Sequence, residues 1–210
     1  MAKSGPSEIP VKGNDDRRVA RTKAALLTAF RQILFERGFE NVAVRDIAAR
    51  ADVGRSTFYE HYTGKEDILG ASMSKFLAVF ASTVESDSPP DDLAQVLDHL
   101  WSNRRLTDAI FSGTPRKVLG RTLAQQLETR LEQLAVGEPG FPLRLASIQL
   151  AEGQLALVEA WLRRKSPCAT AQLARALHAT SRASAQALLN GLPVTRSGAE
   201  SSFLPPVRSA

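Results

Sequence analysis

The chain has 210 residues, of which 43% are hydrophobic, and a formal net charge of +5. This length is enough for one medium domain or two small ones with a true apolar core. No run of about 18 apolar residues occurs, so we expect no membrane span. The N-terminal stretch MAKSGPSEIPVKG lacks the apolar segment of a signal peptide, and the single Cys168 cannot form an internal disulfide. These features predict a soluble cytoplasmic protein.

The positive charge is concentrated near the N-terminus. Residues 1–65 hold 12 Lys and Arg against 8 Asp and Glu, a balance of +4. Residues 66–210 hold 15 against 14, a balance of +1. This asymmetry favours an anionic partner for the first third of the chain, although a solvated basic surface would give the same count.

The apolar pattern predicts helices throughout, with no strand-like alternation. Residues 1–16 are expected to form a flexible basic arm, and a helix should follow over residues 17–37 and end at Gly38. Asp15 and Asp16 would favour that helix start. Residues 44–51 and 55–62 form two short helices joined by a turn at residues 51–54.

Two short helices joined by a glycine-containing turn are the signature of a helix-turn-helix, here over residues 42–61. The second helix would project Arg55, Ser56, Thr57, Tyr59 and His61 from one side. Such a helix fits a DNA major groove, where its N-terminal residues reach base edges. A longer helix then begins at Lys65, with a capping box between Thr63 and Glu66.

The remainder is also expected to be helical. Four segments are predicted, with residues 191–210 as a disordered tail: residues 91–110, 115–134, 143–165 and 169–189. The segment 143–165 is apolar over most of its circumference, which requires burial on several sides.

The segment RTKAALLTAFRQILFERGFENVAVRDIAARADVGRSTFYEHYTGKEDIL, residues 21–69, strongly resembles the TetR family of transcription regulators. The resemblance implies an all-α fold. A helix-turn-helix DNA-binding domain (residues 17–79) would be joined by a long helix to a ligand-binding and dimerisation domain (residues 80–190). It also implies a homodimer through the last two long helices, residues 143–165 and 169–189.

The family's DNA contacts carry over to matching positions in this chain. Arg45 begins the first turn helix and, with Arg55 and Ser56, would read bases, whereas Thr57, Tyr59 and His61 would touch backbone or base edges. Lys65 matches a lysine that contacts phosphate, and Phe58 and Tyr62 match core positions. One departure is Ala43, where the family usually has a capping Thr or Ser. Its loss costs roughly 0.5–2 kcal/mol unless Asn41 caps instead.

The resemblance implies a repressor that a small-molecule effector releases from a palindromic operator. The C-terminal half diverges, so the effector is not named by the sequence. The candidate lining residues are Phe76, Phe80, His99, Trp101, Arg104, Arg121, Gln125, Gln149 and Glu152. No cofactor is implied, and His99 lacks the neighbours that a metal site needs.

Three other functions stay open at this point. The protein could be a ligand-independent or activator-type regulator, a redox sensor acting through Cys168, or an architectural DNA binder. An enzyme is not expected, because the common catalytic and nucleotide-binding motifs are missing from the sequence.

Overall fold

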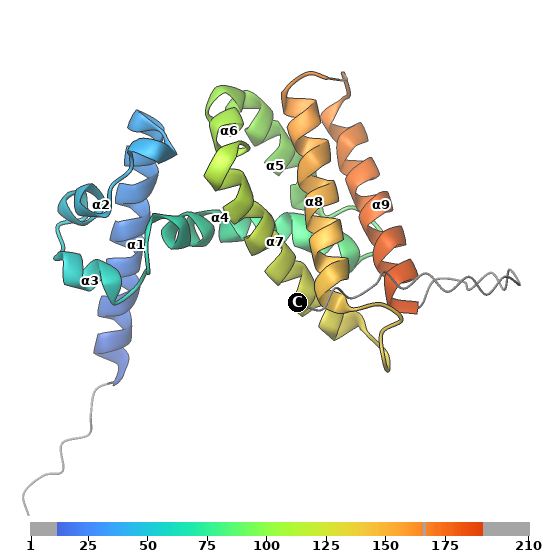
Figure 1. The fold of residues 1–210 in the computed structure, drawn as a ribbon, viewed down its shortest axis with the longest axis horizontal. Helices are drawn as coiled ribbons and strands as arrows, with labels where there is room; N and C mark the ends of the chain where they lie inside the picture. The colour runs from blue at the N-terminus through green and yellow to red at the C-terminus, as the bar shows by residue number, and fades with distance from the viewer. Residues whose placement is uncertain (1–11, 166, 191–210) are drawn as a thin grey trace, which may run out of the picture.

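The computed structural model describes residues 12–165 and 167–190, and within these ranges every regular element is helical. Helices α1 to α3 lie to one side, and α4 connects them to the bundle formed by α5 to α9 (Figure 1). The all-helical prediction is therefore confirmed. The elements, in chain order, are α1 Lys12–Arg37, η1 Phe39–Asn41, α2 Val44–Arg50, α3 Arg55–Tyr59, α4 Lys65–Ala81, η2 Ser82–Val84, α5 Asp91–Ser102, α6 Arg104–Ile110, α7 Gly113–Leu134, α8 Leu143–Leu162 and α9 Thr170–Asn190.

Several helix boundaries differ from the sequence-based expectation. Helix α1 begins at Lys12, so only residues 1–11 of the expected arm, together with the expected tail 191–210, lie outside the described residues. The single helix expected over residues 91–110 is instead two helices. They are separated at Asn103, whose side-chain Nδ2 donates to the carbonyl of His99 at 2.9 Å. An asparagine that caps the preceding turn competes with helix continuation.

The end of α1 follows the expectation. Gly38 has φ +72°, in the left-handed region that glycine enters at little cost, and its N–H donates to the carbonyl of Leu34 at 3.0 Å. Phe39 and Val42 are buried directly after this turn. The chain therefore leaves α1 with two apolar side chains already in the core.

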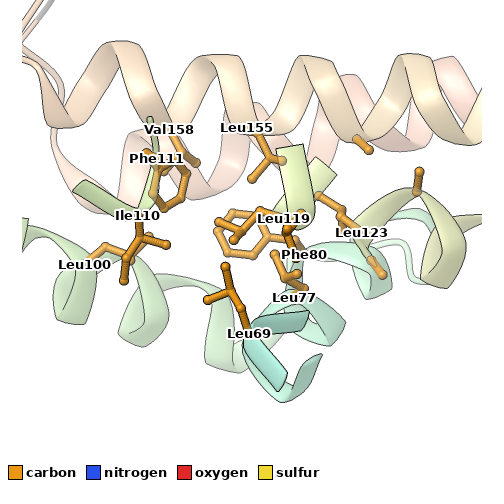
Figure 2. Close-up of a cluster of buried hydrophobic side chains, with 14 of the residues drawn as sticks. Leu69, Leu77, Phe80, Leu100, Ile110, Phe111, Leu119, Leu123, Leu155 and Val158 are labelled. Atoms are coloured by element: carbon orange, nitrogen blue, oxygen red, sulfur yellow. The ribbon is translucent and has the colours of Figure 1, made fainter. Parts of the chain in front are cut away.

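The large core lies between α4, α7 and α8. Figure 2 shows Leu69, Leu77 and Phe80 of α4 facing Leu119 and Leu123 of α7, with Leu155 and Val158 of α8 beyond them. Phe80, Leu119 and Leu155 have no exposed surface. The segment Lys65–Val84 has a mean hydropathy of 1.2 and is long enough to cross a membrane. Ile68, Leu69, Leu77 and Phe80 are buried, and Met73, Phe76 and Val79 pack half-buried against the same core, which is the pattern of a core helix in a folded domain.

Polar side chains fasten the second half of α4 to its neighbours. Gln126 of α7 donates to the carbonyl and the hydroxyl of Ser74, both at 3.0 Å, and Arg130 donates to the carbonyl of Ala78 at 3.3 Å. Further along, Gln154 of α8 donates to the hydroxyls of Thr83 and Ser181, both at 2.9 Å. These contacts join η2 to α8 and α9 through a buried polar network.

Candidate nucleic-acid interface

Helix α2 starts without a side-chain cap. Ala43 is its N-cap residue, in extended conformation, and no side chain bonds the free amides of the first turn. The suggestion that Asn41 caps this helix is wrong, because its Nδ2 donates to the carbonyl of Arg37 at 2.8 Å. Asn41 therefore bonds the last carbonyl of α1 and does not cap the start of α2. Asp46, in the first turn of α2, supplies negative charge close to the helix N-terminus.

The turn between the two short helices is built on Asp52. Asp52 has φ +53°, and the N–H of Val53 returns to the carbonyl of Ala48 at 3.0 Å. Aspartate tolerates this left-handed conformation better than most residues. Gly54 instead has φ −68° and serves as the N-cap residue of α3. The turn was correctly predicted, but its left-handed residue is the aspartate and not the glycine.

Two aromatic residues hold α3 and the segment after it on the core. Phe58 is fully buried and Tyr62 nearly so, with ring centroids 5.8 Å apart, which confirms both as core residues. Burial and the nearby Asp67 carboxylate raise the pKa of the Tyr62 phenol. Helix α3 ends at Tyr59, earlier than predicted. The amides of His61 and Tyr62 both bond the carbonyl of Phe58.

The opposite side of α3 faces solvent. Arg55 and Ser56 are exposed, and Thr57 and His61 are half-buried. Tyr59 is 51% exposed, with its ring meeting the Phe58 ring edge-on at 5.4 Å. Within the described part of the chain, Arg55 makes no ion pair. The polar side chains therefore point away from the core that anchors the helix, which leaves them free to meet a partner.

Arg45 lies near the start of α2. Its Nε is 3.4 Å from Asp46 Oδ1, but its side chain is 78% exposed. An exposed pair of this kind contributes little to stability. Arg37 also approaches Asp46, at 3.5 Å, so the carboxylate is shared and the Arg45 guanidinium is available at the surface.

Lys65 has contacts that the sequence did not indicate. Its Nζ donates to the carbonyls of Phe39 and Glu40, each at 3.4 Å, and lies 4.6 Å from the centre of the Phe39 ring. The expected capping box is wrong. The Asp67 carboxylate accepts a hydrogen bond from the backbone N–H of Thr63 at 2.9 Å, and no side chain caps at Gly64. The start of α4 is thereby held against the connection between α1 and α2.

The candidate effector residues are not gathered into one cavity. Phe80 lies in the closed core and Phe76 packs beside it, with ring centroids 5.3 Å apart. His99 is exposed at the end of α5. Glu152 binds Arg116 at 2.7 Å.

Two of the remaining candidates, Arg121 and Gln125 of α7, line an open cleft of about 900 Å³ between α4 and α7. Glu66 and Ser74 lie on the α4 side of this cleft. Gln149 of α8 instead lines a groove of about 220 Å³ between α8 and α9.

Trp101 and Arg104 form a third location, at the junction of α5 and α6. The Arg104 guanidinium carbon lies 5.5 Å from the Trp101 ring centre. In the described residues no group of three His, Cys, Asp or Glu side chains could hold a metal ion.

Comparison with known proteins places these features in a family. Residues 26–71 match the family model described as "Bacterial regulatory proteins, tetR family". A curated HTH-type transcriptional repressor of Mycobacterium tuberculosis is 28% identical over 66% of this chain and 70% of its own length. The uncharacterised HTH-type regulator YxbF of Bacillus subtilis is 31% identical over 45% of this chain. This chain spans only a quarter of the Bacillus protein's length.

Residues 26–71 thus carry the DNA-binding domain of the TetR family. A solved TetR-family regulator from Streptomyces coelicolor is 21% identical, with a TM-score of 0.52 over 86% of this chain and 99% of that one. This likeness supports the fold, an N-terminal helix-turn-helix followed by a helical C-terminal domain. The predicted helix-turn-helix transcription regulator is thus confirmed at the level of the TetR family.

Proposed function

We propose that the protein is a dimeric repressor that binds a palindromic DNA operator through α2, α3 and the start of α4. The observation that carries the proposal is the solvent-facing side of α3, where Arg55 has no acidic partner among the described residues while Phe58 anchors the opposite side. In a dimer, two such helices about 34 Å apart would enter successive major grooves. The Mycobacterium relative is described as a repressor, which supports repression over activation of transcription.

We assign the contacts by side-chain chemistry. Arg55 and Ser56 at the start of α3 would read base edges, and Arg45 would reach a guanine or a nearby phosphate. Thr57, Tyr59 and His61 would contact the backbone or base edges beside them. Lys65 would bind a phosphate, since its ammonium is held near the protein surface by the Phe39 and Glu40 carbonyls.

The first experiment identifies the operator by selection from random DNA and then compares variants on it. Arg55→Ala should lose about 1–3 kcal/mol of discrimination at one base position, because a bidentate contact is removed.

Lys65→Ala should weaken binding to all sequences and reduce the salt slope by about one. Binding is measured by fluorescence anisotropy across a salt series.

Lys75→Ala is the matched control for Lys65→Ala, since Lys75 is exposed on the same helix. Thermal unfolding of Lys65→Ala shows how much of its effect comes from the lost carbonyl contacts. Unchanged affinity and unchanged salt slope in a folded Lys65→Ala protein would remove the phosphate assignment. If random-sequence selection yields no preferred site, the proposed operator function is wrong.

The dimer is proposed to form through α8 and α9. Three large apolar side chains of α8 are exposed in the isolated chain: Leu145 at 52%, Ile148 at 40% and Leu157 at 43%. A second copy would cover them, with the small residues of α9 allowing close approach between helices.

We further propose that residues 17–79 and 80–190 form the two domains and that the protein is located in the cytoplasm. The protein itself would have no catalytic activity.

Leu157→Asp should convert the dimer to a monomer at micromolar concentration, because a carboxylate would be buried without a partner. Light scattering after size-exclusion chromatography measures the mass. Val136→Asp, at a fully exposed position in the α7–α8 connection, is the control and should remain dimeric. A Leu157→Asp protein that keeps the dimer mass would place the interface elsewhere.

Operator release is proposed to follow binding of a small molecule to the α4–α9 domain. Since α4 carries Lys65 at one end and is fastened to α7 at Ser74 and Ala78, a ligand that shifts the bundle would move the start of α4. The spacing of the two recognition helices would then change and lower operator affinity.

A further inference from the structure

Two tryptophans and two arginines meet where α5, α6 and the end of α8 come together. The rings of Trp101 and Trp161 are 4.8 Å apart between centroids and inclined by 35°. The guanidinium carbons of Arg104 and Arg164 each lie 5.5 Å from the centre of the Trp101 ring. Trp161 Nε1 donates to the carbonyl of Cys168 at 2.9 Å, which ties the pair to the α8–α9 connection.

The two guanidinium charges are not neutralised by the protein. Within the described residues neither Arg104 nor Arg164 forms an ion pair, and Arg104 reaches only the carbonyl of Trp101 at 3.5 Å. The nearby carboxylate of Glu159 is already held by Arg116 and Arg163. Both cations lie within 5.5 Å of the centre of one indole ring, so an anion bound at this ring would be stabilised by two positive charges.

The chemistry of the cluster suits an oxyanion. A guanidinium held over an aromatic face keeps its in-plane N–H donors for other acceptors, and these match two oxygens of a phosphate or carboxylate. The tryptophan rings form an apolar wall on one side, where electrostatic attraction is stronger than in open water. Lys165, exposed beside Arg164, adds to the positive potential.

The backbone of Arg164 gives a second, independent indication. Its φ is +53°, and it occupies the position after the α8 C-cap Arg163. The amide of Arg164 bonds the carbonyl of Trp161, and that of Lys165 bonds the carbonyl of Ala160. This is the Schellman arrangement, in which glycine is the usual residue at the left-handed position. Glycine at position 164 would therefore end α8 equally well, so the arginine side chain is not needed to terminate the helix.

We propose that Arg104 and Arg164, held against Trp101, bind an oxyanion group, a phosphate or a carboxylate, of a small molecule. The proposal rests on the proposed function only in taking this molecule as the effector. The site includes Trp101 and Arg104 from the sequence-based candidates and adds Arg164 and Trp161, which lie about 60 residues further along the chain.

The chain contains only two tryptophans, so its tryptophan fluorescence reports this site alone. The full-length protein is titrated with inorganic phosphate and, in a separate arm, with succinate, both at constant ionic strength set by chloride. A saturable change in one arm identifies phosphate or carboxylate as the preferred group, and a change in both identifies a general oxyanion site. No saturable change in either arm overturns the proposal.

The decisive variants are Arg164→Gly and Arg104→Gln. Each should weaken the saturable response at least tenfold, while Arg164→Gly should unfold at the same or a higher temperature because glycine relieves the left-handed backbone. Arg175→Gln, at an exposed arginine of α9, is the matched control and should respond as the unmodified chain does. A double variant Arg104→Gln/Arg164→Gly that retains the full response also overturns the proposal.

Operator binding is measured separately, by mobility shift on the unmodified protein with and without the bound anion. Failure to find an operator would refute the proposed repressor function without altering the fluorescence result. Failure of the fluorescence response would refute the oxyanion site without altering the operator result.

Discussion

Phe80→Ala is expected to lower the free energy of unfolding by about 3–5 kcal/mol. The ring of Phe80 has no exposed surface and lies among Leu77, Leu119 and Leu155 (Figure 2). Its removal takes apolar surface out of the core and leaves a cavity bordered by three helices, which α4, α7 and α8 cannot close without losing other contacts.

Chemical denaturation followed by circular dichroism measures this change. Phe35→Ala is the matched control, because it deletes the same side chain at a position that is 63% exposed. It should change the unfolding free energy by less than about 0.5 kcal/mol. A Phe80→Ala protein as stable as Phe35→Ala would show that the α4–α7–α8 packing is not as the structure describes.

Phe58→Ala is expected to have the second large effect, of about 3–5 kcal/mol, and to act on the helix-turn-helix. Phe58 is the one residue of α3 that is buried, and it packs on Tyr62. A helix of five residues has no stability of its own in water. Without this ring, α3 would lose its attachment, so operator affinity should fall by roughly tenfold for each 1.4 kcal/mol lost from the docked conformation.

Two readouts separate the expected result from simple misfolding. Helix content and dimer mass should be largely retained, because α4 to α9 form their own core, whereas operator binding in a mobility shift should be lost. Phe35→Ala, in the same N-terminal domain, should keep normal operator affinity. Normal operator affinity in Phe58→Ala would mean that α3 is not the helix that contacts the DNA bases.

The sequence predicted best where one local signal determines the structure. The helical period from residue 17 onward, Gly38 as the stop of α1 and the short turn after Ala51 all appear where expected. The buried positions of Phe58 and Tyr62 followed from their helical spacing and from the family resemblance. In each case the information lies within a few neighbouring residues.

Features that depend on partners distant in sequence were not predicted. Lys65 was expected to reach DNA, but it also contacts the carbonyls of Phe39 and Glu40, which lie 26 and 25 residues before it in the chain. The break at Asn103 was also missed although its partner is only four residues away, because the Asn103 side chain could bond either solvent or the His99 carbonyl. Periodicity does not encode either of these alternatives.

The effector residues were the least predictable group. A helical pattern shows that Phe76, Phe80 and Trp101 are on apolar faces, but not whether a face meets another helix or a cavity. The structure places Phe80 in the closed core and Trp101 beside two arginines. Arg164 could have been suspected only from the basic run after Trp161, because its left-handed backbone is invisible in the sequence.

The hydrogen bonds from Gln126 and Arg130 to α4 have a mechanical consequence. They grip α4 at Ser74 and Ala78, while Lys65 at the other end of the same 17-residue helix touches the domain that holds α3. At 1.5 Å per residue Lys65 lies about 14–20 Å along the helix from these two contacts, so a tilt of about 5° around them displaces Lys65 by about 1–2 Å. Helix α4 thus converts a small rotation within the bundle into a larger displacement of Lys65 at the edge of the helix-turn-helix.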